Sequence, residues 1–212
     1  MFEILKTKDG SDTVFSKQYN ATYHSIHGAV RESNHVFIEN GLRAAISKFD
    51  SVLILEIGLG TALNLFLTLK ELSDKPIRYT AIEKFPLLEN IYSNLSYAKE
   101  EGFIHLHQLP WNKKVEVKDG FVIEKINTDF LDFKSNEIYN LVYLDAFAPT
   151  TQNELWQAEV LKKIFQMMAP QGILVTYCAK GELKRNLKSV GFIVETLAGP
   201  PGKREITRAI RP

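Results

Sequence analysis

The chain has 212 residues, and its 26 basic and 25 acidic side chains leave a formal net charge of +1. Hydrophobic residues make up 45% of the sequence and charged residues 24%, which excludes a disordered or fibrous chain. The single cysteine, Cys178, excludes an internal disulfide and a cysteine-rich zinc site. A near-neutral chain also lacks the strongly basic composition that is the simplest indication of nucleic-acid binding.

No stretch of the sequence approaches the roughly 18 uninterrupted apolar residues that a membrane helix needs. The N-terminus carries charges from Glu3 onward and has no apolar core, so we expect no secretory leader. We therefore expect a cytoplasmic protein that acts without a membrane partner and without a bound metal.

In chain order, the first predicted element is a β-hairpin with strands at 2–8 and 13–17 and its turn at Asp9-Gly10-Ser11. A helix is expected at 35–48, where apolar residues recur at helical spacing. From residue 51 onward, apolar runs alternate with helical patterns. We expect strands at 52–55, 77–82, 121–127, 138–144, 173–177, 192–197 and 205–210, and helices at 62–72, 154–168 and 181–190.

Two local features add to this pattern. Asp119-Gly120 predicts a second hairpin between 113–118 and 121–127, and Pro86 suits the first turn of a further helix. Alternating strands and helices predict an α/β fold, in which a mostly parallel, Rossmann-like sheet has helices on both faces. We expect a single domain over 1–212, with a hairpin and a cofactor-covering helical segment at 1–50 and the sheet core at 51–212.

Four of the apolar runs end in or just before a carboxylate, namely Glu56, Glu83, Asp129 and Asp145. Ligands of open α/β sheets bind outside the carboxyl ends of the strands, so these four side chains are expected to line one crevice. Any one of them could instead cap a helix or lie in a solvated turn. Their recurrence at four strand ends favours a shared binding site.

The sequence from Glu56 to Gly60 is a glycine-rich turn between a strand and a helix. Gly58 and Gly60 permit a tight turn and close approach of a ligand to the backbone. No Gly-Lys-Ser/Thr sequence follows, which excludes a phosphate-cradling P-loop. A carboxylate in this position suits a ligand with an ammonium or sulfonium group, and S-adenosylmethionine carries both.

The next two acids suit the nucleoside part of such a ligand. Glu83 stands where a carboxylate can accept hydrogen bonds from two ribose hydroxyls, a spacing that nicotinamide-binding enzymes share. Asp129 directly precedes Phe130 and could accept a hydrogen bond from an adenine amino group. The position of Asp129 favours S-adenosylmethionine over a nicotinamide cofactor.

Asp145 begins the sequence Asp-Ala-Phe-Ala-Pro, which places an acid close to Phe147 and Pro149. A primary amine that accepts a methyl group is protonated at neutral pH and must lose a proton before its nitrogen can attack. A carboxylate within hydrogen-bonding reach can hold the amine in line and favour release of that proton. Phe147 could equally serve packing alone, and Pro149 could serve to stiffen the turn.

Together these motifs resemble the class I S-adenosylmethionine-dependent methyltransferases, and more narrowly the methyltransferase module of the MnmC-type tRNA wobble-uridine enzymes. The matching stretches are 23–37, 55–64, 145–156 and 199–205. The Asp-Ala-Phe-x-Pro…Trp block and the Lys-Arg-Glu ending are more specific than the glycine-rich turn. The resemblance implies a seven-stranded sheet and methylation of the amine of 5-aminomethyl(-2-thio)uridine at the wobble position, in the anticodon loop of tRNA.

The resemblance also implies roles for individual residues. Asp145 is the predicted catalytic residue. The residues expected at S-adenosylmethionine are Glu56, Gly58, Leu59, Gly60, Glu83, Asp129, Phe130, Gly28 and Glu32. The residues expected at the substrate are Phe147, Pro149, Lys203 and Arg204. Among the first group, Glu56 and the glycines of the turn are assigned to the methionine part, Glu83 to the ribose and Asp129 to the adenine, whereas Glu32 could instead mark a helix start.

Two departures from the family pattern are visible. The third glycine of the turn is Ala62 here, which should leave cofactor binding little affected. The bifunctional family members carry a flavin-dependent oxidase domain after the methyltransferase, and 212 residues leave no room for it. We therefore expect a standalone methyltransferase that depends on a separate oxidase or on an upstream wobble-uridine enzyme for its substrate.

Two alternatives stay open. A transferase acting on small, polyamine-like amines would share the cofactor acids, although such enzymes have a second acid soon after the strand-end Asp, where this chain has Ala146-Phe147. A non-catalytic module that binds a cofactor or RNA would not need Asp145. Nicotinamide binding ranks below both.

The near-zero net charge conceals an uneven distribution. Residues 1–179 carry a net charge of −4, whereas residues 180–212 carry eight basic and three acidic side chains, a net charge of +5. The basic C-terminal stretch is where we expect tRNA phosphates to bind. A solvated helix face is an equally simple explanation for the charges at 184–188.

Overall fold

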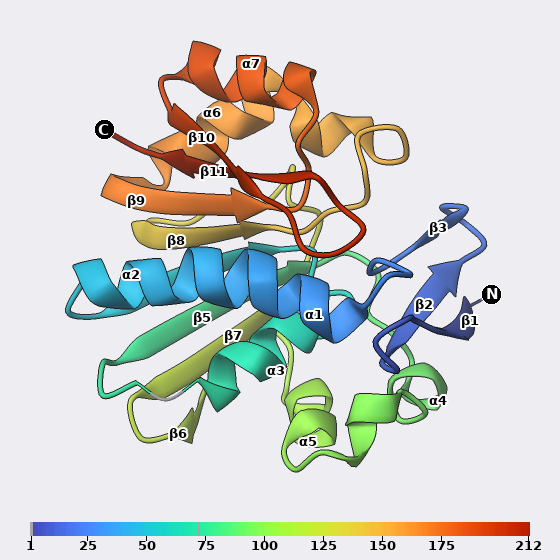
Figure 1. The fold of residues 1–212 in the computed structure, drawn as a ribbon. Helices are drawn as coiled ribbons and strands as arrows, with labels where there is room; N and C mark the ends of the chain where they lie inside the picture. Colours follow the sequence, from blue (N-terminus) through green and yellow to red (C-terminus); the bar gives the residue numbers. More distant parts are fainter. Residues whose placement is uncertain (1, 72) are drawn as a thin grey trace.

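Within residues 2–71 and 73–212, which this computed structural model describes, an eight-stranded sheet forms the centre of the fold, and a three-stranded sheet β1-β2-β3 lies beside it (Figure 1). The order of the central strands is β10-β11-β9-β8-β4-β5-β7-β6. These strands are β4 (Val52–Ile57), β5 (Ile77–Glu83), β6 (Lys114–Lys118), β7 (Phe121–Asn127), β8 (Tyr139–Leu144), β9 (Met168–Thr176), β10 (Ile193–Ala198) and β11 (Glu205–Ile210).

The α/β class and the mostly parallel sheet are confirmed. Strands β7, β5, β4, β8 and β9 pair in parallel, whereas β11, β10 and β6 join by antiparallel pairing. The expected number of seven strands is wrong by one, because β6 of the predicted second hairpin extends the edge of the same sheet. Parallel pairing brings the carboxyl ends of the five inner strands to one edge.

Helices cover both faces of this sheet (Figure 1). One face is covered by a continuous helical segment and by α3 (Leu63–Lys70), and the other by α6 (Ala158–Gln166) and α7 (Gly181–Val190). The continuous segment consists of α1 (Ala29–Ser33), the π-helical η1 (Asn34–Leu42) and α2 (Arg43–Lys48). Three short helices follow β5, and one 3₁₀ turn precedes α6: α4 (Glu89–Tyr92), η2 (Ser96–Lys99), α5 (Phe103–Gln108) and η3 (Asn153–Trp156).

Alternate residues of β4 supply two separate hydrophobic clusters. Ile54 packs with the residues of α1, η1 and α3, whereas Leu55 and Ile57 pack with those of α6 and α7. This alternation follows from the two-residue repeat of a strand, and burial on both faces explains why the run is continuously apolar. Glu56 therefore shares the face of Ile54 and is directed toward α3, although it lies one residue from the end of its strand.

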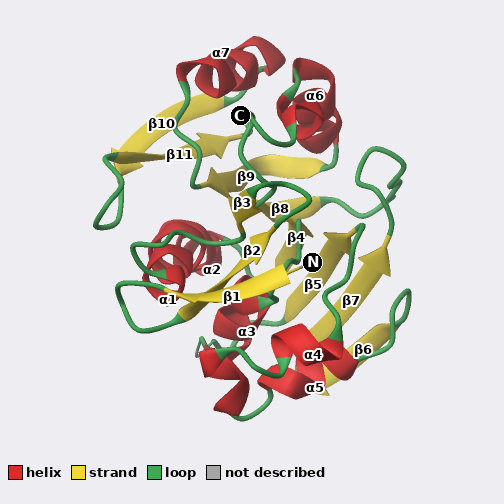
Figure 2. Cartoon of the chain, turned by 90° about the vertical axis from the view of Figure 1, so that its right-hand side faces the viewer, coloured by secondary structure: helices red, strands yellow, loops and turns green. Residues whose placement is uncertain are grey.

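The first residues form a small sheet of β1 (Phe2–Lys6), β2 (Asp12–Ser16) and β3 (Ala21–Thr22), which confirms the N-terminal hairpin. This sheet lies in front of the carboxyl edge of the central sheet, as the end-on view shows (Figure 2). Val14, Ala29 and Val36 belong to the same hydrophobic cluster as the central strands. The N-terminal segment is thus packed where the central strands end.

Several predicted boundaries are wrong. The helix expected at 35–48 begins at Ala29. The helix expected at 154–168 is a 3₁₀ turn followed by α6, and it ends before Met168, which already starts β9. Pro86 lies outside the first turn of α4, which begins at Glu89. The helix after β4 ends at Lys70, and its expected last residue, Leu72, lies outside the described residues. In the described chain, no helix combines the length and the apolar character that a membrane crossing requires.

Candidate active site

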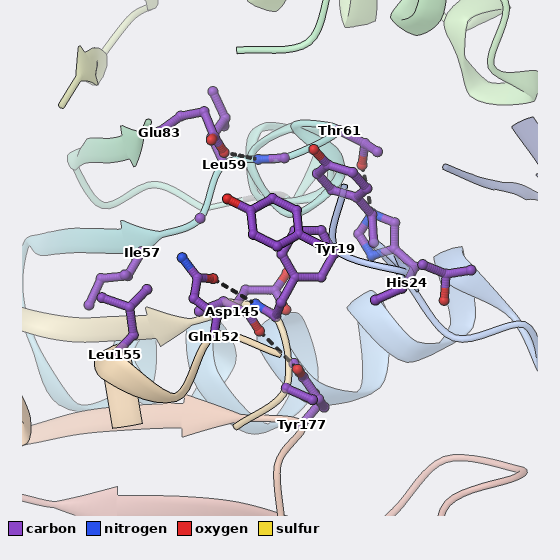
Figure 3. A pocket seen from close by; sticks show the side chains of 18 of the residues that line it. Tyr19, His24, Ile57, Leu59, Thr61, Glu83, Asp145, Gln152, Leu155 and Tyr177 are labelled. Atoms are coloured by element: carbon purple, nitrogen blue, oxygen red, sulfur yellow. Dashed lines mark hydrogen bonds between the residues drawn. The ribbon is translucent and has the colours of Figure 1, made fainter. Parts of the chain in front are cut away.

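A cavity of about 490 Å³ opens at the carboxyl edge of β4, β5 and β8, a size typical of small-molecule sites (Figure 3). Its walls come from the glycine-rich turn after β4, the ends of β5, β7 and β8, and the N-terminal segment around β3. Lys203, in the connection between β10 and β11, completes the rim. Three of the four strand-end acids line it: Glu83, Asp129 and Asp145.

The glycine-rich turn is held against the neighbouring strands by its backbone. Gly58 has a φ of +93° and its N–H donates to the carbonyl of Ile82 at 3.0 Å. A Cβ at Gly58 would lie 2.7 Å from the carbonyl oxygen of Asp145, and one at Gly60 would lie 2.7 Å from the ring of Tyr23. Both positions therefore require glycine, for conformation and for space.

Glu83 is bound by the backbone on both sides. The N–H of Gly60 donates to its Oε2 at 2.9 Å, and the N–H of Phe85 donates to its Oε1 at 2.8 Å. Burial raises the pKa of this carboxyl, and the two backbone donors act against that shift. Each oxygen keeps a further lone pair for a ligand hydroxyl in the cavity.

Asp129 lies at the mouth of the cavity and is already paired. Lys84 Nζ lies 2.8 Å from Asp129 Oδ2, and the N–H of Leu131 donates to Oδ1 at 2.9 Å. Burial alone would raise the pKa of Asp129, but these two donors outweigh it and the pKa is lowered. The adjacent Phe130 is buried and contributes an apolar wall, with Lys163 Nζ 4.7 Å from its ring centroid.

Asp145 directly follows β8 and faces the cavity beside the glycine-rich turn (Figure 3). Its N–H donates to the carbonyl of Ile57 at 3.0 Å, and its Oδ2 accepts from Asn64 Nδ2 at 2.7 Å. Burial raises the pKa of this carboxyl to about 7; the hydrogen bond from Asn64 and the charge of Lys203 act against burial, and the charge of Glu32 adds to it. Asp145 can therefore take up and release a proton near neutral pH.

Three side chains hold the loop that follows Asp145. Tyr177 donates its hydroxyl to the carbonyl of Ala146 at 2.8 Å, and Trp156 Nε1 donates to the carbonyl of Phe147 at 2.8 Å. The N–H of Phe147 donates to Gln152 Oε1 at 3.2 Å. These bonds give a physical reason for the Asp-Ala-Phe…Trp spacing, since the tryptophan anchors the loop that carries the acid.

Phe147 belongs to an aromatic group at the cavity wall. Its ring stacks on Tyr19 with 4.6 Å between centroids, and Tyr23 meets it edge-on at 4.9 Å. Tyr19 comes from the turn between β2 and β3, and no local sequence pattern identifies it as a site residue. The group offers flat aromatic faces next to Asp145.

Glu32 and Lys203 form an ion pair at the rim, with 2.7 Å between Oε1 and Nζ. The N–H of Ser25 donates to Glu32 Oε2 at 2.9 Å, and Lys203 Nζ lies 4.3 Å from the centroid of the Tyr177 ring. Arg204, in contrast, is exposed and does not line the cavity. The two neighbouring basic residues that were predicted to bind substrate therefore occupy different places.

Two histidines clamp the glycine-rich turn at Thr61, a feature absent from the sequence predictions. His24 Nε2 lies 2.6 Å from Thr61 Oγ1, and His107 Nε2 donates to the carbonyl of Thr61 at 3.1 Å. Burial lowers the pKa of both histidines to about 4, so both are neutral at physiological pH. They fix the turn by hydrogen bonding and not by charge.

The structure thus brings most of the predicted site residues together and places four of them outside the cavity walls. Lining the cavity are Gly58, Leu59, Gly60, Glu83, Asp129, Phe130, Glu32, Asp145, Phe147 and Lys203. Pro149 and Arg204 do not line the cavity, Gly28 is the N-cap residue of α1, and Glu56 is fully buried and accepts from Asn64. The roles assigned to all these residues stay predictions.

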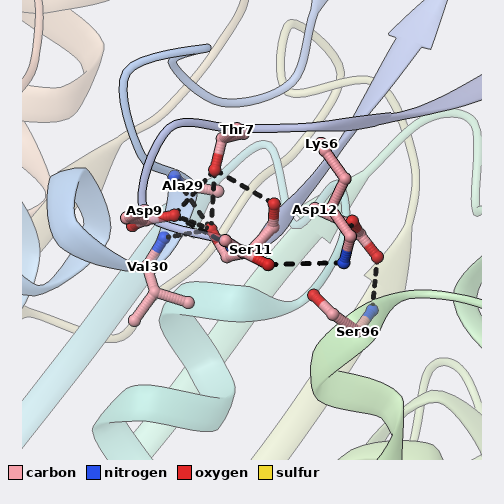
Figure 4. A network of polar contacts seen from close by, with 9 residues as sticks. Lys6, Thr7, Asp9, Ser11, Asp12, Ala29, Val30 and Ser96 are labelled. Carbon is pink, nitrogen blue, oxygen red and sulfur yellow. Dashed lines mark hydrogen bonds and ion pairs between the residues drawn. The ribbon is translucent and has the colours of Figure 1, made fainter.

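The turn of the N-terminal hairpin caps α1, the helix that carries Glu32; Asp9 and Ser11 lie against Ala29 and Val30 (Figure 4). Ser11 Oγ accepts from the N–H groups of Ala29 and Val30 at 3.2 and 3.3 Å, and Asp9 Oδ2 accepts from the N–H of Arg31 at 3.0 Å. The free N–H groups of the first helical turn therefore find partners from a distant segment. Burial would raise the pKa of Asp9, but hydrogen bonds, led by that from Ser11, outweigh it and lower the pKa to about 2.

These features fit a cationic nucleoside ligand. The glycines let a ligand approach the backbone, Glu83 retains acceptor capacity, and Asp145 Oδ1 has no hydrogen bond within the described residues. No group of three or more histidine, cysteine, aspartate or glutamate side chains in the described ranges is arranged to hold a metal ion.

Comparison with known proteins decides the cofactor class. A family model described as S-adenosyl-L-methionine-dependent methyltransferase matches residues 84–212, more than half of the chain. The chain belongs to this methyltransferase family. The predicted S-adenosylmethionine cofactor and the enzyme class are thereby confirmed.

Relatives of this methyltransferase place it more narrowly. A tRNA 5-methylaminomethyl-2-thiouridine biosynthesis bifunctional protein MnmC from Cupriavidus necator is 29% identical over 213 residues, which are 92% of this chain and 32% of the relative. The chain thus spans about a third of the length of that protein. The crystal structure of MnmC2 from Aquifex aeolicus matches 99% of this chain and 70% of that chain, at 28% identity and a TM-score of 0.80. The predicted resemblance to MnmC-type proteins is confirmed.

A third similarity shows the fold alone. Spermidine synthase from Thermotoga maritima matches 100% of this chain and 80% of its own chain, with a TM-score of 0.65 at 12% identity. A polyamine-type transferase, the alternative left open by the sequence, therefore shares the architecture of this methyltransferase without a comparable sequence relationship.

We expect Gly58→Ala to weaken S-adenosylmethionine binding by about tenfold or more, because the new Cβ would press on the carbonyl of Asp145 and move the turn. Titration calorimetry measures the affinity. Gly102→Ala is the matched control, since Gly102 has a similar φ of +87° but open space around it. Equal affinity in the Gly58 variant and in the wild type would contradict the predicted role of the turn.

We expect Asp9→Ala to lower the free energy of unfolding by about 1–2 kcal/mol, because it removes hydrogen bonds that cap α1. The pKa of Asp9 is lowered from 3.8 to about 2, so its stabilising contribution is complete above pH 4 and is lost as the pH falls through 2. Urea unfolding at several pH values tests this, with the exposed Asp50→Ala as control. A destabilisation that is unchanged at pH 2 would argue against this origin.

Proposed function

We propose that this protein transfers a methyl group from S-adenosylmethionine to the amine of 5-aminomethyl(-2-thio)uridine at the wobble position of tRNA. The observation that carries the proposal is Asp145, which lines the cavity together with the glycine-rich turn and Phe147, and whose Oδ1 accepts no hydrogen bond from the described residues. The name of the MnmC relatives supports the proposal, because a methylaminomethyl group is the product of methylating an aminomethyl group.

In this proposal the cofactor lies along the carboxyl edge of β4 and β5. The backbone of Gly58, Leu59 and Gly60 would face its methionine part, and Glu83 would accept from the ribose hydroxyls. Asp129 and Phe130 would bind the adenine, with Lys84 holding Asp129 in place. When bound, the cofactor supplies the methyl group from its sulfonium sulfur.

Asp145 would bind the substrate amine and accept its proton. The ammonium group donates a hydrogen bond to Oδ1, and its proton passes to this oxygen as the amine becomes neutral. The neutral nitrogen would then present its lone pair to the methyl group that the bound cofactor supplies. Asp145 suits this task because burial raises its pKa to about 7, which narrows the gap to the amine without preventing ionisation.

The aromatic group would receive the uracil ring. Stacking on Phe147 and Tyr19 positions a base through its flat face, and such stacking contributes about 1–3 kcal/mol per base in proteins that bind single strands. An anticodon base is already in a single-stranded loop, so extruding it costs less than opening a duplex.

A basic surface beside the cavity would hold the tRNA backbone. Lys184, Lys203 and Arg208 are engaged with Glu205, Glu32 and Glu195. Among the described residues, four other basic side chains of the C-terminal stretch are exposed and form no ion pair: Lys180, Arg185, Lys188 and Arg204. We also propose that a separate oxidase or another wobble-uridine enzyme generates the amine, and that the protein acts in the cytoplasm.

We expect Asp145→Ala to reduce methyl transfer to tRNA that carries aminomethyluridine by at least about a hundredfold, a loss typical of a removed catalytic base. S-adenosylmethionine affinity should stay within several-fold. In the wild type, the rate should rise with pH through about 7, since only the ionised carboxylate accepts the proton. Labelled methyl transfer followed by nucleoside analysis measures the activity of the variant and the pH dependence of the wild type. Full activity of the variant, or label in polyamines instead of uridine, would contradict the proposal.

We expect Lys180→Ala and Arg185→Ala each to weaken tRNA binding and to reduce the slope of log affinity against log salt concentration. The reason is that each lost cation leaves one phosphate contact unmade. Lys180 is the N-cap residue of α7, just after the carboxyl end of β9. Lys118→Ala is a suitable control, because this exposed lysine lies at the end of β6 that is remote from the cavity. A salt dependence equal in all variants would remove this surface from the proposal.

A further inference from the structure

Behind Asp145, a single asparagine joins two buried carboxyl groups. Asn64, on α3, is 2% exposed, and its Nδ2 donates to Glu56 Oε1 at 3.0 Å and to Asp145 Oδ2 at 2.7 Å. A side-chain amide has only two N–H hydrogens, so one goes to each carboxyl group and both are used. If the amide were turned over, its oxygen would lie against the ionised Asp145, which has no hydrogen to donate.

Two polar atoms next to this contact are left without hydrogen-bond partners in the described part of the chain. Within the described residues, Asn64 Oδ1 and Glu56 Oε2 are buried and accept no hydrogen bond. Leaving buried polar atoms unsatisfied costs free energy, yet Asn64 Nδ2 holds Asp145 Oδ2 at a short distance. Asp145 lines the cavity, and its Oδ1 accepts no hydrogen bond from the described residues.

We propose that Asn64 is the positioning residue of the reaction, which anchors Oδ2 of Asp145 so that Oδ1 points at the substrate amine, and that the buried Glu56 orients Asn64. This inference rests on the proposed function only for the identity of the amine. It gives Glu56 a role different from the expected contact with the cofactor, because the side chain is fully buried and does not line the cavity.

The charges around Asp145 support this division of roles. Two carboxyl groups that share one amide cannot both ionise easily in a buried site. Glu56 is fully buried, receives one hydrogen bond and has an unpartnered Oε2 within the described residues, so its ionised form is poorly compensated. Burial, and after it the charge of Asp145, raise the pKa of Glu56 well above its ordinary value and favour its protonated form. Titratable groups that interact electrostatically with Asp145 come from three elements and two connecting segments: Glu32, Glu56, Tyr79, Tyr177 and Lys203.

The first test replaces Asn64 by Leu, which has a similar size and no donor, and by Ser, which has one hydrogen where the amide has two. Loss of the hydrogen bond to the ionised form raises the pKa of Asp145, so the rising limb of the pH–rate profile should move up by about one pH unit. Activity should recover at higher pH, and S-adenosylmethionine affinity should stay within about threefold. Thr68→Val, one turn further along α3, controls for packing of the helix, since the Thr68 hydroxyl donates to the Asn64 carbonyl and reaches neither acid.

The second test reads the carboxyl groups directly. In protein labelled with ¹³C at aspartate and glutamate carboxyls, Asp145 should titrate at higher pH in the Asn64 variants than in the wild type, with Asp145→Asn used to assign its signal. Glu56→Gln should leave the Asp145 titration within about 0.3 pH units, because a neutral group replaces a neutral group. This measurement needs no tRNA, so it stays decisive even if methylation of aminomethyluridine is not observed.

Three results would overturn the inference. An unchanged Asp145 titration and an unmoved pH profile in both Asn64 variants would reduce Asn64 to a packing residue. A large fall in the Asp145 pKa in Glu56→Gln would show that Glu56 carries a charge. A loss of S-adenosylmethionine affinity greater than about tenfold in Glu56→Gln would return Glu56 to the cofactor site.

Discussion

The parallel pairing of β4 with β5 on one side and β8 on the other is the constraint on which the site depends. The pairing continues past the end of β4, where Gly58 donates to Ile82 and Asp145 donates to Ile57. Because the three strands end at one edge, residues far apart in the sequence meet around a single turn. The glycines are required there since the Asp145 backbone and the Tyr23 ring leave no room for a side chain.

The second consequence of this arrangement is a crowding of acids. Glu32, Glu56, Glu83 and Asp145 are largely or wholly removed from water. Glu32 and Glu83 are held by backbone N–H groups, Glu32 also by Lys203, and Asn64 is shared by Glu56 and Asp145. Buried carboxyl groups of like charge raise one another's pKa, and a cation placed among them relieves the repulsion. The site is thus suited to ligands that carry positive charge, as both a sulfonium cofactor and a protonated amine do.

The N-terminal segment contributes side chains directly to this site. Tyr19, Tyr23, His24 and Glu32 all line the cavity, and all come from the first 33 residues. The capping of α1 by Asp9 and Ser11 and the packing of Gly202 against His27 tie this segment to both the sheet edge and the β10–β11 connection. Cofactor, substrate amine and base are therefore all expected to contact groups that this segment orders.

The sequence by itself determined the α/β class, the glycine-rich turn and the set of strand-end acids, because apolar periodicity and turn chemistry are local properties. The addition of the predicted strand β6 to the central sheet, the early start of α1 and the short helices after β5 depend on tertiary packing, and the sequence patterns did not predict them. Only the tertiary structure decided which way each acid faces. Glu56 lies on the α3 face of β4 and is covered by Asn64, whereas Asp145 follows β8 and reaches the cavity. Tyr19 joins Phe147 from a distant turn, a contact that no spacing along the chain encodes.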